Sequence, residues 1–556
     1  MKRNFKKPVI LILSAVLTIG LLFSFVNKND KLFAIAKNLD IFASLVRELD
    51  SYYVDEIDAE ELVTIGINAM LSELDPYTEF IPEENSDDFR LLTTGEYAGV
   101  GALIGNRTGA NMILMPYKGF PAQSAGLRIG DEILKVDTVN VVNSLTSDIS
   151  KLLKGPANTN VFVQVKRGTD TISVNLTRKK IVISNVPFYG KLDEKTGYIK
   201  LSDFTTNAAS DVRNALVDLK SQGITRLVLD VRDNPGGILK EAVDIVNLFI
   251  PKGKEVVRTI GKLENVNSVY KTTKSPVDKD IPMVVLINER SASAAEIVAG
   301  ALQDYDRAVL VGRRTFGKGL VQTTIPLSYN SQIKITTAKY YIPSGRCIQA
   351  IDYSQENRDE NGKSISIPDS LRKEFKTKNG RIVLDGAGIE PDKSSESKSF
   401  APITYSLVAR NLVFEFGNKF FLENEMISNP REFVVTDEIY ADFVASLEGK
   451  DYDYTTYVEK TLEDLEKYAL KEKFFNDIKP TIEDLKKKVS HNKEQDLETF
   501  KFEIKEALRE ELVSRYYFQQ GIVEASLMND DDVKAALAIL SSPVEITRVL
   551  TASVKL

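Results

Sequence analysis

The 556-residue chain has very little of two residues that often carry enzyme chemistry: one histidine, His491, and one cysteine, Cys347. With a single histidine, a hydrolase built on this chain needs a different general base. One cysteine excludes an intrachain disulfide, which a chain of this size can do without. A Cys/His enzyme that pairs these two residues is disfavoured, because neither has a recognisable motif around it.

The composition is that of a multidomain globular protein. The chain is 43% hydrophobic and 27% charged, and its length indicates about three to four domains. A net charge of −7 makes nucleic acid a poor candidate partner. No group of His, Cys or carboxylate residues has the spacing of metal ligands, so the sequence implies no metal or cofactor.

The first residues have the pattern of an export segment. Residues 1–7 carry four basic side chains, and residues 8–26 are 19 uncharged, mostly apolar positions. A helix of this length spans about 28 Å, enough to cross a hydrocarbon core. The preceding basic residues predict that the N-terminus stays inside and the remainder is exported. A cleaved signal peptide is the alternative, but no small-x-small cleavage site follows, so residues 1–28 are predicted to be an uncleaved anchor.

One segment combines a serine at a helix start with a lysine between glycines. Residues 283–287 form a β-branched apolar run that predicts a buried strand, and Ser293 begins the helix that follows. The helix dipole there favours negative charge. Lys318 lies between Gly317 and Gly319; as a base its pKa must fall from about 10.4 to about 7–8. An N-cap serine and a surface lysine are the commoner uses of such residues, and both stay open on this pattern alone.

The surrounding residues carry a family resemblance. Residues 291–304 (SASAAEIVAGALQD), residues 315–319 (TFGKG) and Gln322 resemble the C-terminal processing, or tail-specific, serine proteases. In that family the nucleophile and its lysine base are 25 positions apart, which implies Ser293, not Ser291, with Lys318. The resemblance implies that Gln322 orients the lysine. An ideal strand would place these two residues about 13 Å apart, so the glycine turn must curl the lysine back.

The same resemblance extends to residues 229–239 (LDVRDNPGGIL), a strand that enters a Pro-Gly-Gly turn. It implies an oxyanion hole made by the amides of Gly236 and Ala294. A purely structural turn is the alternative, and it applies equally to Gly237. One position departs from the family, which often has serine where this chain has Ala295. The dyad itself is intact, so we expect little effect.

Residues 96–105 (EYAGVGALIG), with residues 121–127 and 130–137, resemble a PDZ domain. Such a domain adds a peptide to a sheet edge and holds its terminal carboxylate with loop amides. The resemblance implies five peptide-binding residues: Gly99, Val100, Gly101, Leu103 and Ile104. An ordinary small β-domain with a tight turn is the alternative.

Together these patterns predict a multidomain α/β protein. Its parts are the anchor (1–28), an N-terminal helical region (29–88), a PDZ domain (89–180), a protease core (181–400) and a C-terminal helical domain (401–556). The core is expected to be a crotonase/Clp-protease-like α/β fold into which the PDZ domain is inserted. The charge-rich C-terminal domain has helical apolar spacing at positions such as Leu497, Ile504 and Leu508. It is either a solvated helical domain or a docking surface for an adaptor or another copy of the chain.

The predicted function is that of a serine endopeptidase that recognises protein C-terminal tails. Its expected partners are protein substrates with free, apolar C-termini, and the membrane through the anchor. Its expected location is the cell envelope of a bacterium, anchored in the inner membrane and facing the periplasm, or periplasmic if the N-terminus is cleaved. A non-catalytic PDZ scaffold that only binds tails is the alternative function.

Overall fold

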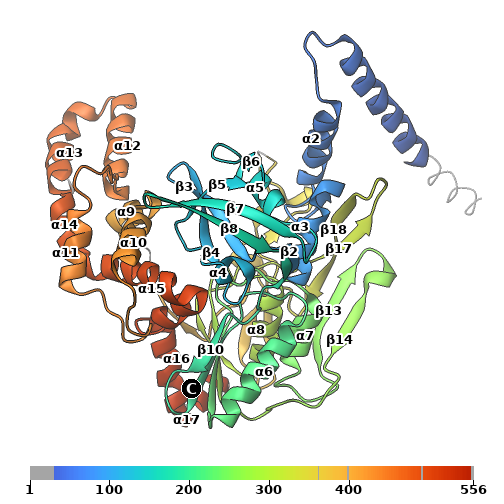
Figure 1. Cartoon of the computed structure of the whole chain (residues 1–556). Coiled ribbons are helices and arrows are strands. Elements are labelled where there is room, and N and C mark those ends of the chain that lie inside the picture. Colours follow the sequence, from blue (N-terminus) through green and yellow to red (C-terminus); the bar gives the residue numbers. More distant parts are fainter. Residues whose placement is uncertain (1–30, 361, 397–399, 490–491, 552–556) are drawn as a thin grey trace, which may run out of the picture. The chain divides into compact units, whose positions relative to one another are not determined.

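The computed structural model describes residues 31–360, 362–396, 400–489 and 492–551 (Figure 1). The predicted anchor and His491 lie outside the described residues. The chain divides into two compact units, Met1–Pro82 with Thr324–Thr336, and Glu83–Thr323 with Thr337–Leu556. Among the described helices, none combines the length and the apolar character needed to cross a bilayer.

The smaller unit contains the predicted N-terminal helices. Residues 31–52 are helical, and α2 (Ala59–Ser72) follows, with Asp58 as an N-cap that accepts hydrogen bonds from two first-turn amides. The short strand β1 (Glu79–Ile81) pairs antiparallel with the first residues of β18 (Gln332–Tyr341).

In the larger unit, residues 96–182 form an inserted β-domain. Its sheet has the order β3-β4-β5-β7-β8, with β6 paired to β5. The domain is entered through β2 (Glu96–Gly99) and left through β9 (Lys179–Val182), which pair antiparallel and bring entry and exit together. Its elements after β2 are β3 (Ala102–Arg107), β4 (Ala110–Pro116), α4 (Pro121–Ser124), β5 (Glu132–Val136), β6 (Val139–Asn140), α5 (Thr146–Leu153), β7 (Asn160–Arg167) and β8 (Asp170–Thr177). Because β2 and β9 pair, the chain enters and leaves this domain at neighbouring positions.

The centre of the larger unit is a six-stranded sheet of order β10-β11-β12-β15-β16-β23. The pairing of β10 with β11 is antiparallel and all the others are parallel. The strands are β10 (Phe188–Lys191), β11 (Thr196–Lys200), β12 (Arg226–Asp230), β15 (Met283–Ile287), β16 (Val309–Gly312) and β23 (Lys393–Ser394). The sheet follows from continuous apolar runs such as residues 283–287, which suit strands buried on both faces.

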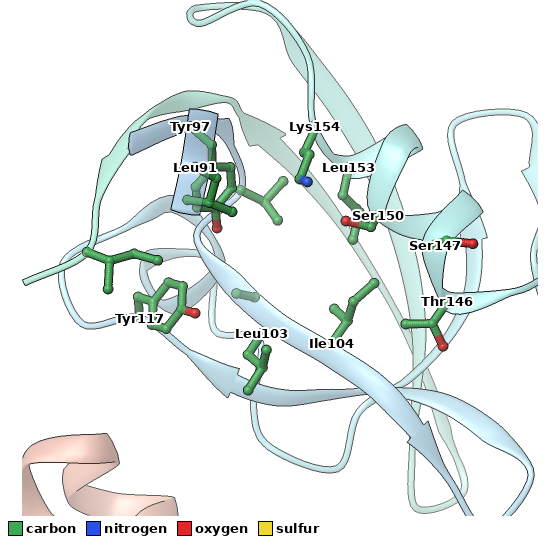
Figure 2. Close-up of a pocket in the computed structure, with 13 residues that line it drawn as sticks. Leu91, Tyr97, Leu103, Ile104, Tyr117, Thr146, Ser147, Ser150, Leu153 and Lys154 are labelled. Carbon is green, nitrogen blue, oxygen red and sulfur yellow. The ribbon is translucent and has the colours of Figure 1, made fainter. Parts of the chain in front are cut away.

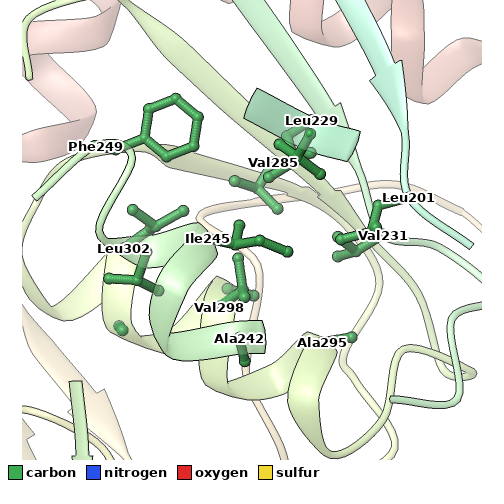
Figure 3. Close-up of a cluster of buried hydrophobic side chains, with 14 of the residues drawn as sticks. Leu201, Leu229, Val231, Ala242, Ile245, Phe249, Val285, Ala295, Val298 and Leu302 are labelled. Carbon is green, nitrogen blue, oxygen red and sulfur yellow. The ribbon is translucent and has the colours of Figure 1, made fainter. Parts of the chain in front are cut away.

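Helices cover both faces of this sheet. On one face α6 (Ala208–Ser221), α7 (Leu239–Val246) and α8 (Ala294–Asp304) enclose the largest apolar core, part of which is drawn in Figure 3. On the other face α16 (Asp531–Ser541) and α17 (Pro543–Leu550) pack against the strands. The last described helices are therefore a layer of this core.

A second sheet borders the core. In it β13 (Glu255–Gly261) pairs antiparallel with β14 (Ser268–Lys271) and with the end of β18, and β17 (Leu320–Pro326) also pairs with β18. Two small hairpins follow in the chain: β19 (Ile351–Asp352) with β20 (Ile365–Ser366), and β21 (Glu374–Lys376) with β22 (Ile382–Leu384).

The C-terminal helices have an apolar core of their own. The positions predicted to face it, Leu497, Ile504 and Leu508, are buried. The helices are α9 (Pro402–Ala409), α10 (Leu412–Glu423), α11 (Asp437–Ala445), α12 (Tyr457–Lys471), α13 (Phe475–Val489), α14 (Lys493–Thr499) and α15 (Lys501–Ser526). One of them reaches the inserted β-domain, where the Arg128 guanidinium lies 5.1 Å from the ring centroid of Phe421 on α10.

The packing of α8 gives a stability prediction. Leu302 is fully buried in the core of Figure 3, so Leu302→Ala should lower the free energy of unfolding by about 2–5 kcal/mol because it leaves a cavity. Val217 on α6 is 49% exposed, and Val217→Ala should change that free energy by less than about 0.5 kcal/mol. Urea denaturation followed by circular dichroism measures both, and equal effects of the two changes would contradict this packing.

Candidate active site

Ser293 occupies the sharp turn between β15 and α8. Its backbone angles, φ 55° and ψ −112°, lie in a region that residues other than glycine rarely adopt. The neighbouring Ser291 supports the turn: its hydroxyl donates to the Val231 carbonyl at 2.8 Å and accepts from the Asn288 amide at 2.9 Å. A strained strand-to-helix turn is the local geometry that exposes a nucleophilic serine.

A buried carboxylate, Glu296, joins this turn to the lysine loop. It accepts hydrogen bonds from the Ser293 amide at 2.8 Å and the Lys318 amide at 2.9 Å. It also accepts from the Gly317 amide at 2.7 Å and the Thr315 hydroxyl at 2.5 Å. One side chain therefore holds the main chain of both predicted dyad residues.

The environment of Glu296 also sets its protonation. Burial raises the pKa of Glu296 to about 7, and the hydrogen bonds from Thr315, Lys318, Gly317 and Ser293 oppose that rise. Four donors suit the carboxylate form, because a neutral carboxyl would place its own proton against one of them. Burial therefore favours the neutral form of Glu296, and its four hydrogen-bond donors favour the ionised form.

Tyr340 makes a second link between the same two segments. Its hydroxyl oxygen lies 2.5 Å from the Lys318 carbonyl and 3.1 Å from the Ser293 carbonyl, so its single proton is shared between these two acceptors. Its ring is buried in the main core, which fixes the hydroxyl. The predicted nucleophile and base, 25 residues apart in sequence, are thus held together through their backbones.

The two glycines around Lys318 permit a close backbone approach. A Cβ on Gly317 would lie 2.4 Å from the Ala350 Cβ, and one on Gly319 would lie 2.8 Å from the Gln349 amide nitrogen. Gly317 also has a φ of 85°, which favours glycine. Gln322 lies further along, on β17, and is half-buried.

The predicted oxyanion turn lies against the serine. A Cβ on Gly236 would be 2.7 Å from the Ser293 Cβ and 2.9 Å from the Ala294 amide nitrogen, so only glycine fits there. The Gly236 amide donates to the Asn234 side-chain oxygen at 2.9 Å. The Ala292 amide donates to the Asn234 carbonyl at 2.9 Å, which fastens the two turns together.

Sequence reasoning did not assign roles to Glu296, Tyr340 and Asn234. The sequence does carry a signal for the first, because a serine followed three residues later by glutamate is the pattern of a capping box. No local pattern identifies Tyr340, which lies 47 residues after Ser293 and reaches it only through the fold. Cys347 is half-buried, and burial raises the pKa of its thiol, so it is not an activated nucleophile.

The inserted β-domain has a cavity of about 240 Å³ between β3 and α5, drawn in Figure 2. Three of the predicted peptide-binding residues, Val100, Leu103 and Ile104, line it. Gly99 ends β2, Gly101 lies in the loop between β2 and β3, and neither is among the lining residues. The walls are mostly apolar, which suits an apolar side chain or tail.

The phenol of Tyr97 lines this cavity. The nearby main-chain amides of Gly101 and Ala102 act to lower its pKa. Burial and the neighbouring Tyr117 raise the pKa of Tyr97, so its side chain is a neutral phenol. Two adjacent main-chain N–H groups, at Gly101 and at the first residue of β3, therefore lie beside a residue of the cavity wall.

Comparisons with known proteins agree with this architecture. Residues 195–355 match Peptidase family S41, residues 113–167 match a PDZ domain, and residues 403–540 match the C-terminal helical domain of a probable PDZ-protease. A probable CtpA-like serine protease of Staphylococcus aureus strain N315 is 34% identical over 343 residues, which cover 61% of this chain and 68% of that protein. The carboxy-terminal-processing protease of Bartonella bacilliformis is 33% identical over 378 residues, covering 66% and 85% of the two chains.

Among solved structures, the photosystem II D1 C-terminal processing protease is 31% identical, covers 59% of this chain and 91% of its own, and has a TM-score of 0.32. The relatives and the matched families confirm the predicted fold class, with its α/β protease core, PDZ domain and terminal helical regions. The chain belongs to Peptidase family S41 and is a carboxy-terminal-processing serine peptidase with a PDZ domain.

Proposed function

We propose that this protein is an endopeptidase that cleaves proteins bearing free, apolar C-terminal tails, with Ser293 as nucleophile and Lys318 as general base. The observation that carries this proposal is that Glu296 and Tyr340 each bind the backbones of both residues. Such double attachment keeps a nucleophile and its base in one geometry, which is the main requirement of a dyad.

The proposed reaction is acyl transfer. Neutral Lys318 takes the proton from the Ser293 hydroxyl, whose oxygen attacks the scissile carbonyl carbon. Lys318 then gives that proton to the leaving amine. Water, with Lys318 again as base, hydrolyses the resulting ester and restores the serine. In this mechanism Gln322 orients the lysine.

The amides of Ala294 and Gly236 are the proposed donors to the oxyanion. The closeness of Gly236 to both Ser293 and Ala294 supports this assignment. The Gly236 amide is bonded to Asn234 in this conformation, so its part in the oxyanion hole requires it to exchange that partner for the substrate oxygen. One such donor is typically worth about 2.7–4 kcal/mol to catalysis.

The PDZ domain is the proposed reader of the substrate tail. The apolar cavity beside β3 suits an apolar terminal side chain, and the Gly101 and Ala102 amides suit its carboxylate. The carboxylate would accept hydrogen bonds from those two amides, beside the Tyr97 phenol. A PDZ domain of a carboxy-terminal protease from Vibrio cholerae has been solved in complex with a peptide, which supports the same role here.

The proposed location is the cell envelope, facing outward from the inner membrane. The basic residues 2–7 and the apolar residues 8–26 support it, since this order directs the following chain across a membrane. An adaptor or a second copy of the chain is a further proposed partner of the C-terminal helices.

The dyad gives the first test of the proposal. Ser293→Ala and Lys318→Ala should each lower kcat by at least about 10³-fold, because each removes an essential group of one unit. The assay follows cleavage of an unfolded protein with an apolar C-terminus by the purified full chain. Tail binding by both variants should match the wild type. Binding of free C-termini without any cleavage by the wild type would instead favour the scaffold alternative.

Tail reading gives a second test. Amidation of a substrate peptide's C-terminus should weaken its binding by about tenfold or more, because a neutral amide is a poorer partner for the loop N–H groups. Ile104→Asp, which puts a charge into the cavity wall, should have an effect of similar size. Val139→Asp lies in the same domain at an exposed position on β6 and should leave binding unchanged. Equal binding of free and amidated peptides would contradict the assignment.

Glu296 gives a prediction for catalysis. Glu296→Gln retains the shape but replaces one acceptor oxygen by an NH₂ group that faces an N–H donor. The resulting shift of the Ser293 and Lys318 backbones should lower kcat by about 10²-fold. Peptide binding by the PDZ domain, measured by fluorescence anisotropy, should remain as in the wild type. A variant with full activity would show that the carboxylate does not hold the dyad.

The same residue gives a pH prediction. The pKa of Glu296 rises from 4.5 to about 7 on folding, so the folded protein binds a proton at this site between those pH values when the unfolded chain does not. Ionisation of Glu296 therefore costs stability as pH rises through that window. Relative to Glu296→Gln, the wild type should lose Tm as pH rises from 4.5 to about 7, and the difference should level off above that. A constant Tm difference across this range would contradict the raised pKa.

A further inference from the structure

The residue that precedes the oxyanion turn, Arg232, lies in a cluster of carboxylates. Its side chain is only 14% exposed. Its guanidinium contacts Asp230, at the end of β12, with the closest approach 2.7 Å. Asp230 in turn accepts from the Tyr198 hydroxyl at 2.7 Å and lies 3.3 Å from the Lys200 ammonium. These first contacts are all within the catalytic sheet.

Two further carboxylates come from the start of α16, about 300 residues later in the chain. The Asp530 carboxylate accepts from both terminal nitrogens of Arg232, at 2.6 and 3.1 Å. The Asp532 carboxylate accepts from Nη1 at 2.9 Å and also lies 3.9 Å from Arg313. The bidentate geometry of Asp530 gives both direction and strength to the contact.

The packing of α16 fixes where these two carboxylates lie. Val533, Ala536 and Leu540 are buried in an apolar cluster with sheet residues that include Val228 and Leu286. In addition, Asp530 is the N-cap of α16 and accepts hydrogen bonds from the amides of Asp532 and Val533. The helix therefore presents its acidic end to the edge of the sheet where the oxyanion turn begins.

From Arg232 a continuous set of contacts leads to the serine. The Arg232 carbonyl accepts from the Lys200 ammonium at 2.7 Å. The next two residues are also held by hydrogen bonds. The Asp233 amide donates to the Asn288 side chain at 2.9 Å. The Asn234 side chain donates to the Leu201 carbonyl at 2.8 Å. Asn234 then holds the Ala292 amide, one residue before Ser293. The position of Arg232 thus sets where this turn starts.

Arg232 keeps a charged partner even when the carboxylates of Asp530 and Asp532 are neutralised. Burial opposes ionisation of Asp230, yet Arg232 and Lys200 hold the pKa of that carboxyl well below its usual range. Loss of both charges on α16 would leave Arg232 paired with Asp230, so the buried guanidinium would keep a partner. Neutralising Asp530 and Asp532 should therefore change the position of Arg232 without leaving a buried charge unpaired.

We propose that Asp530 and Asp532 are positioning residues for proteolysis: they hold Arg232, and through it the Asp233–Gly237 turn beside Ser293. The C-terminal helical domain thereby completes the active site through the acidic start of α16. This inference rests on the proposed function, because it concerns the geometry of the oxyanion turn.

The test uses charge-neutralising variants of the full chain. Asp530→Asn keeps an N-cap side chain, since asparagine caps as well as aspartate, and removes only the charge. The double variant Asp530→Asn/Asp532→Asn should lower kcat by about 10–100-fold, because it lets the turn shift relative to the serine. KM and tail binding should stay within about twofold, because the PDZ domain is untouched. Asp532→Glu, which restores a charge, should regain at least half of the activity lost by Asp532→Asn.

The matched control is Asp531→Asn, which neutralises a neighbouring carboxylate whose side chain is 55% exposed and should leave kcat unchanged. If the wild type cleaves and the double variant retains full kcat, this inference is wrong and the proposed function still holds. A loss of kcat that merely tracks the unfolded fraction, measured from Tm, also overturns it, since the role would then be structural. A wild type that does not cleave overturns the proposed function and this inference with it.

Discussion

The buried carboxylate of Glu296 is the interaction on which the geometry of the active site depends. Two chain segments meet beside α8, one carrying Ser293 and the other Lys318, and neither segment alone determines the distance between them. Glu296 accepts hydrogen bonds from the backbone amides of both residues. Tyr340 acts as a donor instead, with its hydroxyl shared between their backbone carbonyls. Because the carboxylate is fully buried among four donors, it can shift only if several hydrogen bonds break together.

Other parts of the larger unit also fix the positions of the segments around Ser293. The parallel strands β12 and β15 end side by side, so the turns after them, one carrying Gly236 and the other Ser293, meet at one edge of the sheet. Two hydrogen bonds then join these turns: the Asn234 main-chain carbonyl accepts from the Ala292 amide, and the Asn288 side chain accepts from the Asp233 amide. The layer formed by α16 on the opposite face adds the acidic contacts to Arg232. The protease core therefore includes residues from the far end of the chain.

Much of this could be predicted from the sequence, for reasons that differ between sites. The buried strand at residues 283–287, the helix after Ser293 and the close-packed glycines around Lys318 all follow from local patterns. The C-terminal helices follow from apolar spacing, as Leu497, Ile504 and Leu508 show. The cavity residues Leu103 and Ile104 were assigned through the PDZ resemblance, and they line the cavity.

What could not be predicted is long-range pairing of polar groups. Nothing near Tyr340 in the sequence indicates that its hydroxyl reaches Ser293 and Lys318. The partnership of Arg232 with Asp530 joins positions 298 residues apart and depends on how α16 packs against the sheet. The Gly236 amide, whose proposed role came from a motif, is bonded to Asn234, a detail of backbone orientation that a motif does not contain. Local patterns predict elements, whereas these contacts depend on the assembled fold.

The most direct test of the central claim is to find which residue is activated as the nucleophile. The purified full chain would be treated with a fluorophosphonate, digested, and mapped by mass spectrometry, with Lys318→Ala treated in parallel. We predict a single modified residue, Ser293, and a modification rate that falls sharply in the Lys318→Ala variant. Modification of Ser291 or another serine, or an unchanged rate at Ser293 without the lysine, would contradict it.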